Sequence, residues 1–154
     1  MVDLVESADA TRERRMGVAL WARLARIYGR NIRLAEGRLR AAGLSVAQFD
    51  VLAHVGVHEG ITQQELAQRL LVTQGAITQL LDRLEQRGVV LRCPDGRINR
   101  LVLTDEGRRL RERVVPPQEQ FQAEQFSALS PAEQRQLLRL LGKLQRGQRE
   151  RATL

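Results

Sequence analysis

Apolar residues recur every three or four positions along most of the chain, a spacing that predicts a mainly α-helical protein. The longest such stretch spans residues 11–42, between a segment over 1–10 that is expected to be frayed and Gly43, which is expected to end the helix. Its apolar positions are Val18, Trp21, Leu24, Ile27, Tyr28, Leu34, Ala35 and Leu39. A helix this long has more apolar surface than one small lobe can cover.

Two short helices are predicted between Thr62 and Gly88. Thr62-Gln63-Gln64-Glu65 has the pattern of a capping box, in which the side chains of the first and last residues bond each other's backbone amides. Thr73 is a second N-cap, and Gly88 stands where a left-handed residue commonly ends a helix. The short turn between the two helices, 71–73, is typical of a helix-turn-helix.

The second of these helices, 73–87, has one apolar and one polar side. Ile77, Leu80, Leu81 and Leu84 form its apolar stripe. Glutamine can pair with the N6 and N7 edge of adenine, threonine can contact a thymine methyl, and a glycine lets the backbone approach a duplex. The candidate DNA contacts are therefore Thr73, Gln74, Gly75, Thr78, Gln79 and Arg83. An ordinary solvated face has the same composition, so this helix alone does not establish DNA binding.

A β-hairpin is predicted directly after that helix. The β-rich runs 89–91 and 101–103 bracket Cys93-Pro94-Asp95-Gly96-Arg97, whose Asp-Gly step indicates a tight turn. This hairpin, the wing, would present Arg97 at its tip, with Arg92 and Arg100 on its strands. An arginine placed there suits the negative potential of a DNA minor groove. Residues 44–104 thus form a predicted winged helix-turn-helix lobe within a single domain of residues 1–154.

Further helices are predicted before the helix-turn-helix and after the wing. Ser45 opens a capping box for a helix to about Val57, and Thr104 caps a helix that Pro116-Pro117 should kink or interrupt. Ser130 opens the last helix, whose apolar row is Leu137, Leu138, Leu141 and Leu144. The stripes of 11–42 and 116–147 have no partner in the lobe, and a second copy is the simplest one. Such a homodimer would present two recognition helices to half-sites about one helical turn apart.

Composition supports a soluble DNA-binding protein. The 154 residues carry a formal charge of +7, which suits a polyanionic partner, although all but one of the 25 basic residues are arginine, a bias that genomic base composition also produces. No run approaches the roughly 18 apolar residues of a membrane span, and the N-terminus lacks a signal-peptide pattern, so a cytoplasmic protein without membrane partners is expected. The single cysteine, Cys93, excludes an intramolecular disulfide.

These motifs together resemble the MarR family of bacterial transcription regulators over roughly residues 44–107. The segments that carry the resemblance are 44–52, 62–70, 73–88, 95–97 and 101–107. It implies a triangular homodimer with intertwined terminal helices. It also implies that the aspartate of an Asp-x-Arg wing motif, here Asp95, holds the arginine that enters the minor groove, here Arg97. The chain departs from the family in a shorter wing with glycine at Gly96, where a further arginine is common.

In that family, small aromatic or phenolic anions bind between the winged lobe and the dimer helices and release DNA. The matching pocket candidates here are Trp21, Tyr28, Asp50 and His54. The sequence therefore predicts a regulator, most simply a repressor, that such a ligand releases from an inverted-repeat operator. No cofactor is expected.

Three alternatives remain open from the residues. Asp50, His54 and His58 lie four residues apart on one side of a helix, where they could bind a metal, but no second cluster supports such a site. Cys93 beside Arg92 could be oxidisable. A winged-helix module can also bind protein instead of DNA. No phosphate loop, nucleophile motif or catalytic set is present, so an enzyme is not expected.

Overall fold

The computed structural model describes the backbone of residues 2–152 and the side chains of residues 9–151. The chain forms two compact units, Met1–Val115 and Pro116–Leu154. The first unit contains a long helix, the winged lobe and the first part of helix α5. The second contains the remainder of α5 and the last helix.

The long N-terminal helix is longer than the sequence pattern indicates. Helix α1 spans Val2–Leu39 and passes through a 3-10 turn, η1 (Arg40–Ala42), to Gly43, whose φ of 66° is left-handed as expected. The expectation of a frayed segment over 1–10 is wrong for residues 2–10, and Met1 lies outside the described residues. These residues include no glycine or proline, so the helix extends through them without a break.

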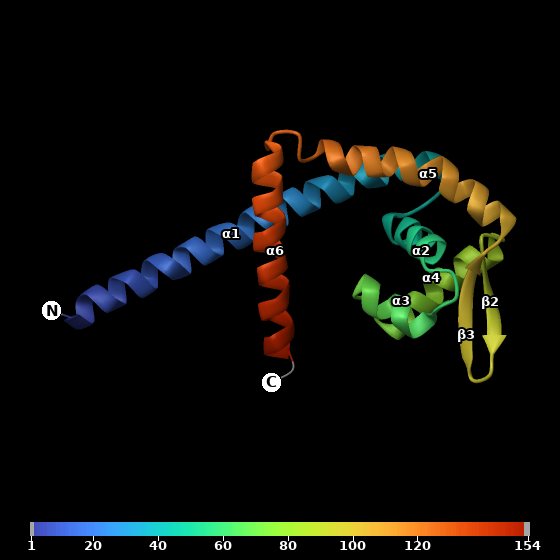
Figure 1. Ribbon diagram of the computed structural model, residues 1–154, viewed down its shortest axis with the longest axis horizontal. Helices are drawn as coiled ribbons and strands as arrows, with labels where there is room; N and C mark the ends of the chain where they lie inside the picture. The colour runs from blue at the N-terminus through green and yellow to red at the C-terminus, as the bar shows by residue number, and fades with distance from the viewer. Residues whose placement is uncertain (1, 153–154) are drawn as a thin grey trace. The chain divides into compact units, whose positions relative to one another are not determined.

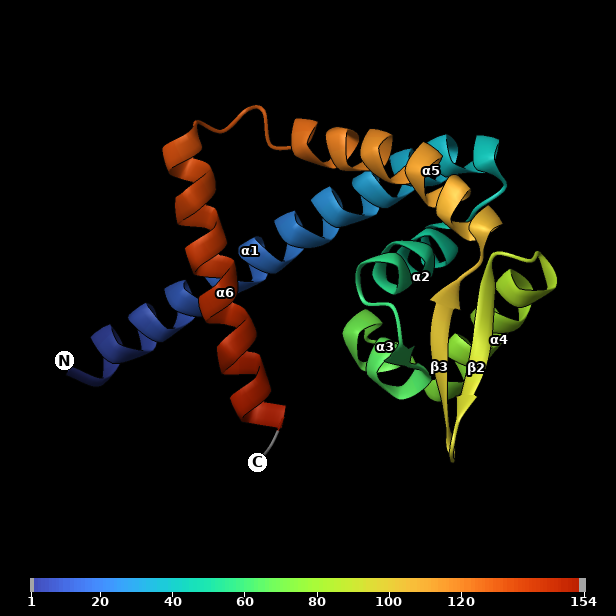
Figure 2. The same ribbon diagram turned by 45° about the vertical axis from the view of Figure 1, so that its right-hand side comes forward.

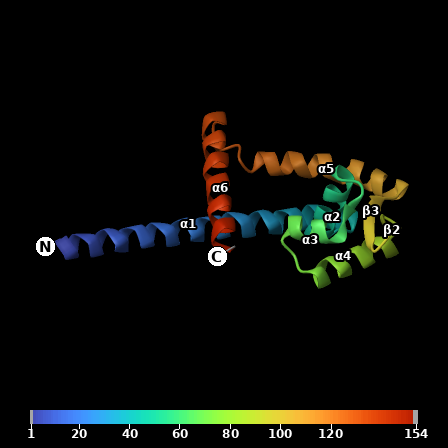
Figure 3. The ribbon, with the colours of Figure 1, turned by 60° about the horizontal axis from the view of Figure 1, so that its bottom comes forward.

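The winged lobe combines three helices with a three-stranded antiparallel sheet (Figure 1). Its elements are α2 (Val46–Val57), β1 (Ile61–Thr62), α3 (Gln63–Leu70), α4 (Gln74–Gln86), β2 (Val90–Asp95) and β3 (Ile98–Leu103). Helix α5 (Asp105–Glu124) follows, and the Thr104 hydroxyl caps it by accepting the Gly107 amide at 2.9 Å. Figures 2 and 3 show α3 and α4 next to each other, with the β2–β3 hairpin beside α4.

The sheet differs from the predicted hairpin in two ways. Strands β2 and β3 are longer than predicted, so Cys93, Pro94 and Asp95 belong to β2 and the turn contains only Gly96 and Arg97. Proline is tolerated because β2 is an edge strand in the order β1-β3-β2. The two-residue strand β1, whose Ile61 pairs with Leu101, was not predicted since so short a segment has no periodicity.

The core of the lobe consists of the predicted apolar stripes. Leu66 of α3, Ile77 and Leu84 of α4 and Leu101 of β3 have no exposed surface. Burying one such side chain stabilises a fold by roughly 1.5–3 kcal/mol. The core therefore fixes which sides of α3, α4 and the hairpin remain exposed.

In the second unit, α5 continues to Glu124 and α6 spans Pro131–Ala152. Pro116 and Pro117 lie inside α5, so of the two predicted outcomes, a kink or an interruption, the interruption is ruled out: each proline removes one helical amide, yet the helix continues on both sides. Phe126 lies beyond the end of α5, in the turns that lead to α6. The predicted start of the last helix at Ser130 is confirmed, and Ser130 forms a capping box there: its amide donates to Glu133 Oε2 at 2.8 Å and its hydroxyl accepts the Glu133 amide at 3.4 Å.

Candidate nucleic-acid interface

The helix-turn-helix is held by the predicted caps. The Thr62 amide donates to Glu65 Oε2 at 2.9 Å and the Glu65 amide to Thr62 Oγ1 at 3.2 Å, which completes the capping box. The Thr62 amide and, to a smaller extent, the Thr62 hydroxyl, which donates to Glu65 Oε2 at 2.9 Å, lower the pKa of the Glu65 carboxyl. Thr73 Oγ1 accepts the Ala76 amide at 3.2 Å. Both helices therefore begin at fixed positions on either side of Leu71, Val72 and Thr73.

The polar side of α4 is open to solvent. Five of the six candidate DNA contacts are exposed: Thr73, Gln74, Gly75, Gln79 and Arg83. Thr78 is half-buried, because its hydroxyl donates to the Gln74 carbonyl at 2.8 Å and accepts from Gln63 Nε2 at 2.7 Å. With its hydroxyl engaged inside the protein, Thr78 offers mainly its methyl group to a ligand.

A hollow of about 300 Å³ lies where the first turns of α3 and α4 meet β3. It is lined by Thr62, Gln63, Gln64, Gln74, Ile98 and Asn99. Four of these side chains are carboxamides, which both donate and accept hydrogen bonds. Of these residues, the sequence predicted only Gln74 as a DNA contact. Gln63 and Gln64 could also have been predicted, because they lie in the first turn of α3, directly after the Thr62 cap.

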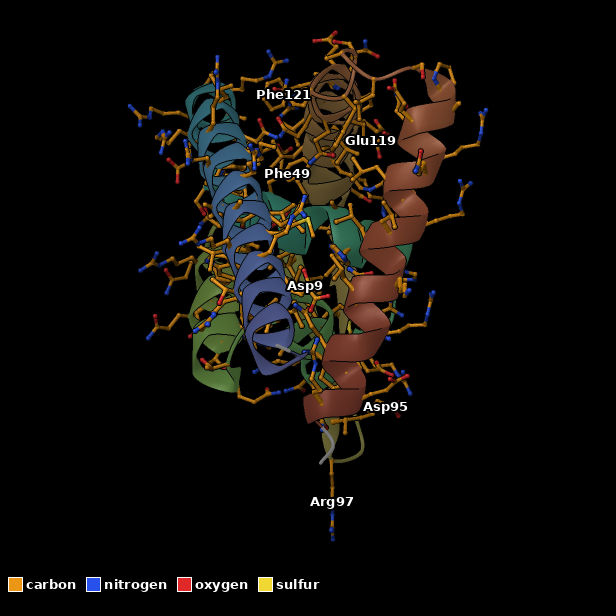
Figure 4. All side chains as sticks on the ribbon, turned by 90° about the vertical axis from the view of Figure 1, so that its left-hand side faces the viewer. Asp9, Phe49, Asp95, Arg97, Glu119 and Phe121 are labelled. Atoms are coloured by element: carbon orange, nitrogen blue, oxygen red, sulfur yellow. The ribbon has the colours of Figure 1, made fainter. Side chains whose placement is uncertain are left out.

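The wing presents Arg97 alone at its tip. Figure 4 shows its side chain extending away from the ribbon, and Arg97 makes no hydrogen bond or ion pair with any residue that the structure describes. The turn that exposes it depends on Gly96, whose φ of 61° is in the left-handed region. This projecting guanidinium is available to an anionic partner.

Asp95 does not hold Arg97, contrary to what the family resemblance implies. Its Oδ2 accepts from Arg100 Nε at 2.6 Å, and Arg100 Nη1 also donates to the Gly60 carbonyl at 3.0 Å. Since Asp95 is opposite Ile98 in the ladder, Arg100 is its diagonal neighbour on the same face of the sheet. Asp95 and Arg100 therefore form an ion pair close to the turn of the wing.

Arg92, on β2, points toward α4 and is 17% exposed. Its guanidinium pairs with Asp82 and Glu85 of α4. The sequence suggested only that this arginine lies near the wing tip, because its partners are seven and ten residues away. It belongs to the joint between the wing and α4.

The remaining candidates do not gather into a site in one chain. Trp21 and Tyr28 of α1 are 71% and 68% exposed, whereas Asp50 and His54 of α2 are half-buried. Burial raises the pKa of the Asp50 carboxyl and the neighbouring His54 partly offsets the effect. His54 Nδ1 lies 2.9 Å from the Asp50 carbonyl, and His58 Nε2 lies 3.3 Å from Arg69 Nη1.

No group of three or more potential metal ligands is found among the residues that the structure covers. Cys93 is an exposed free thiol on β2. Neither the histidines nor this cysteine adds chemistry to the exposed side of α4.

The lobe defines the class of the protein: a winged helix-turn-helix with an exposed recognition helix, α4, and an arginine-tipped wing. A model of the MarR family matches residues 42–97. An HTH-type transcriptional regulator of Bacillus cereus is 36% identical over 134 residues, which cover 86% of this chain and 91% of that protein. The chain belongs to the MarR family of transcriptional regulators.

Solved structures of MarR-family proteins are also similar to this chain. The apo form of MarR from E. coli is 30% identical with a TM-score of 0.66, covering 79% of this chain and 93% of that one. The Mycobacterium tuberculosis MarR-family protein Rv2887, in complex with salicylic acid, is 29% identical with a TM-score of 0.63, covering 79% and 92%. The protein is thus a DNA-binding transcription regulator and not an enzyme.

Within the described range, no helix is both long and apolar enough to cross a lipid bilayer.

Proposed function

We propose that the protein is a sequence-specific repressor that binds an inverted-repeat operator as a homodimer, with α4 in the major groove and the wing in the minor groove. The observation that carries this proposal is the presence, in one lobe, of an exposed polar helix face and a hairpin with a solvent-exposed Arg97 at its tip. The formal charge of +7 favours association with DNA. Access to the chromosome requires a cytoplasmic location.

The side chains of α4 would divide the work of reading DNA. Gln79, exposed in the second turn, suits a bidentate contact with adenine, and Thr78 offers its methyl group to a thymine methyl. Gly75 allows close approach of the helix backbone. Arg83 and the first-turn residues Thr73 and Gln74 suit phosphate or guanine contacts, which fix register or add specificity.

The wing would add affinity with little base discrimination. A guanidinium in the minor groove responds to groove width and potential, so Arg97 would contribute on many sequences. Arg100 pairs with Asp95 and donates to the Gly60 carbonyl, so its role would be to support the wing and not to contact DNA bases.

The homodimer is supported by apolar surface that one chain leaves uncovered. On α1, Trp21, Ile27 and Tyr28 are 71%, 57% and 68% exposed. On α6, Leu138 and Leu144 are 70% and 51% exposed. Soluble monomers rarely expose so many large apolar side chains on two helices, and a two-fold dimer would cover both sets.

The ligand we propose is a small aromatic or phenolic anion. Support comes from the relative Rv2887, whose structure contains salicylic acid. In this chain the pocket would involve Trp21, Tyr28, Asp50 and His54. Such a ligand releases DNA only if it binds the DNA-free conformation more tightly than the DNA-bound one.

A genomic-fragment selection tests the proposal. The purified protein is incubated with sheared DNA of its source organism, and bound fragments are sequenced and aligned. We expect a shared inverted repeat, bound far more tightly than random duplex, with salicylate weakening the complex. Uniform, weak binding to all fragments would instead favour a winged-helix module that docks protein.

A further inference from the structure

The link between the wing and the recognition helix depends on one side chain. Arg92 extends from β2 toward α4, where Nη2 donates to Asp82 Oδ1 at 2.7 Å and Nη1 to Glu85 Oε2 at 2.5 Å. Nη2 also donates to the Thr78 carbonyl at 3.2 Å, and the Arg92 amide donates to Glu85 Oε1 at 3.3 Å. One residue of the wing thus bonds α4 at Thr78, Asp82 and Glu85.

These contacts span about two turns of α4. Residues 78, 82 and 85 are spaced by four and three, so they lie along one side of the helix. Arg92 is 17% exposed, so its ion pairs are shielded from solvent more than those of exposed arginines such as Arg109, which is 62% exposed. Because the guanidinium is planar and bonds several groups at fixed positions, it resists movement of β2 relative to α4, both along the helix axis and around it.

Arg92 lies where it can fix the direction of the wing tip relative to α4. In the ladder, β2 pairs only with β3, so its other edge has no strand to hold it. Arg92 bonds that edge to α4, five residues before Arg97. Its charge also offsets two carboxylates, of Asp82 and Glu85, that would otherwise repel a phosphate backbone near α4.

We propose that Arg92 is a positioning residue: it locks the wing to the recognition helix, so that Arg97 reaches the minor groove when α4 occupies the major groove. This inference rests on the proposed operator binding and adds to it the residue that couples its two contacts. Arg92 itself need not touch DNA.

A double-mutant cycle between Arg92 and Arg97 tests the proposal. Affinity for one selected operator duplex is measured for wild type, Arg92→Met, Arg97→Ala and the double variant. If Arg92 aims the wing, Arg97→Ala should cost about tenfold or more in affinity in the wild-type background and less than about threefold in the Arg92→Met background, because coupled residues are not additive. Arg92→Lys, which keeps the charge but loses the fork of donors, should restore the Arg97 effect in part.

The matched control is Arg87→Met. Arg87 also joins two segments of the first unit, donating to the carbonyls of Gly43 and Ala42 at 2.8 Å each, and neither of these hydrogen bonds reaches the wing. Arg97→Ala should keep its full effect in that background. Thermal unfolding monitors the fold of each variant; if Arg92→Met does not fold, Asp82→Ala with Glu85→Ala removes the same side-chain partners from the helix side.

The outcomes separate the two proposals. An equal Arg97→Ala effect in the wild-type and Arg92→Met backgrounds overturns the positioning role and leaves operator binding intact. No Arg97→Ala effect in wild type means that the wing does not reach DNA, which also overturns it. A wild-type protein that binds no duplex overturns the proposed function and this inference together.

Discussion

Leu71 has a backbone conformation that leucine rarely adopts. It follows α3 with a φ of 55°, and it is the one residue other than glycine with positive φ in the part of the chain that the structure describes. The side chain is 92% exposed, so no packing offsets the strain. The left-handed conformation is imposed because the chain must reverse within three residues to start α4.

Leu71→Gly should therefore stabilise the protein. The left-handed region costs a leucine roughly 1–2 kcal/mol, and the extra freedom of glycine in the unfolded chain returns part of this, leaving a gain of about 0.5–1 kcal/mol. Chemical denaturation of both proteins measures the difference. Leu71→Ala, which keeps the strain, is the control and should show no gain; equal stability of all three would mean that Leu71 is not strained.

Asp50 provides a prediction for pH. Burial raises its folded-state pKa above the unfolded value, so the contribution of this carboxyl to stability is greatest below the unfolded pKa and is lost as pH rises through the folded pKa. Asp50→Asn removes that loss. We expect the variant to unfold at a higher temperature than wild type at pH 7, with the difference shrinking toward pH 4. A difference that grows on acidification would contradict the assignment.

Gln79 is the residue on which direct base reading is most simply tested. It is exposed on α4, and no other protein group among the described residues engages its amide. If it makes a bidentate contact, Gln79→Ala should weaken operator binding by roughly 1–3 kcal/mol and relax preference at one symmetric pair of positions. Competition with operators altered at single positions measures this. Uniform weakening on every sequence would show that Gln79 does not read a base.

At the scale of elements, two arginines hold the wing in place within the lobe. Arg92 bonds β2 to α4, and Arg100 bonds β3 to Asp95 and to the Gly60 carbonyl before β1. The strands of the hairpin are therefore held by α4 on one side and by the segment before β1 on the other, while Arg97 at the tip is exposed to a partner.

Arg97→Ala in both subunits should weaken binding on all operators. Loss of two minor-groove guanidinium groups should also make the fall of log affinity with log salt shallower by up to about two units, near 0.9 per lost contact. A salt titration on one duplex measures both effects. Asp95→Ala, which frees Arg100, should lower affinity less and change the slope little. Wild-type affinity and slope in Arg97→Ala would mean that α4 binds alone.

At the scale of the whole molecule, apolar side chains on α1 and α6 remain uncovered by their own chain. Among residues 9–151, sixteen large hydrophobic residues are exposed, and six of them are on α1 between residues 18 and 28, namely Val18, Leu20, Trp21, Leu24, Ile27 and Tyr28. A homodimer would remove this surface from water and would set the spacing of two recognition helices. The hypothesis of a symmetric operator therefore depends on the hypothesis of a homodimer.

Sedimentation at micromolar concentration should give twice the chain mass of 17.5 kDa. Leu24→Glu with Tyr28→Glu, which places charge in the middle of the stripe, should shift the protein toward monomer and weaken operator binding more than tenfold, since both half-sites are no longer bound together. Arg26→Glu, on the opposite side of α1, is the control for added negative charge. A wild-type monomer would remove the basis for a symmetric operator.

Local features of this protein are determined by its sequence alone. The capping boxes at Ser45, Thr62 and Ser130 join residues three positions apart, and the left-handed glycines at 43 and 88 follow helix ends as predicted. The same is true of the buried stripes of α3 and α4. Each depends on neighbours within a turn or two, so the pattern of residue types is sufficient to predict it.

The partners of the long side chains were decided only by the tertiary structure. Arg100 reaches Gly60, forty residues away, Arg87 reaches Gly43, and Asp95 pairs with Arg100 instead of Arg97. β1 likewise exists only because β3 lies beside it. An arginine can reach any acceptor within its length, and which acceptor is near depends on how distant elements pack, information that no local pattern of residues contains.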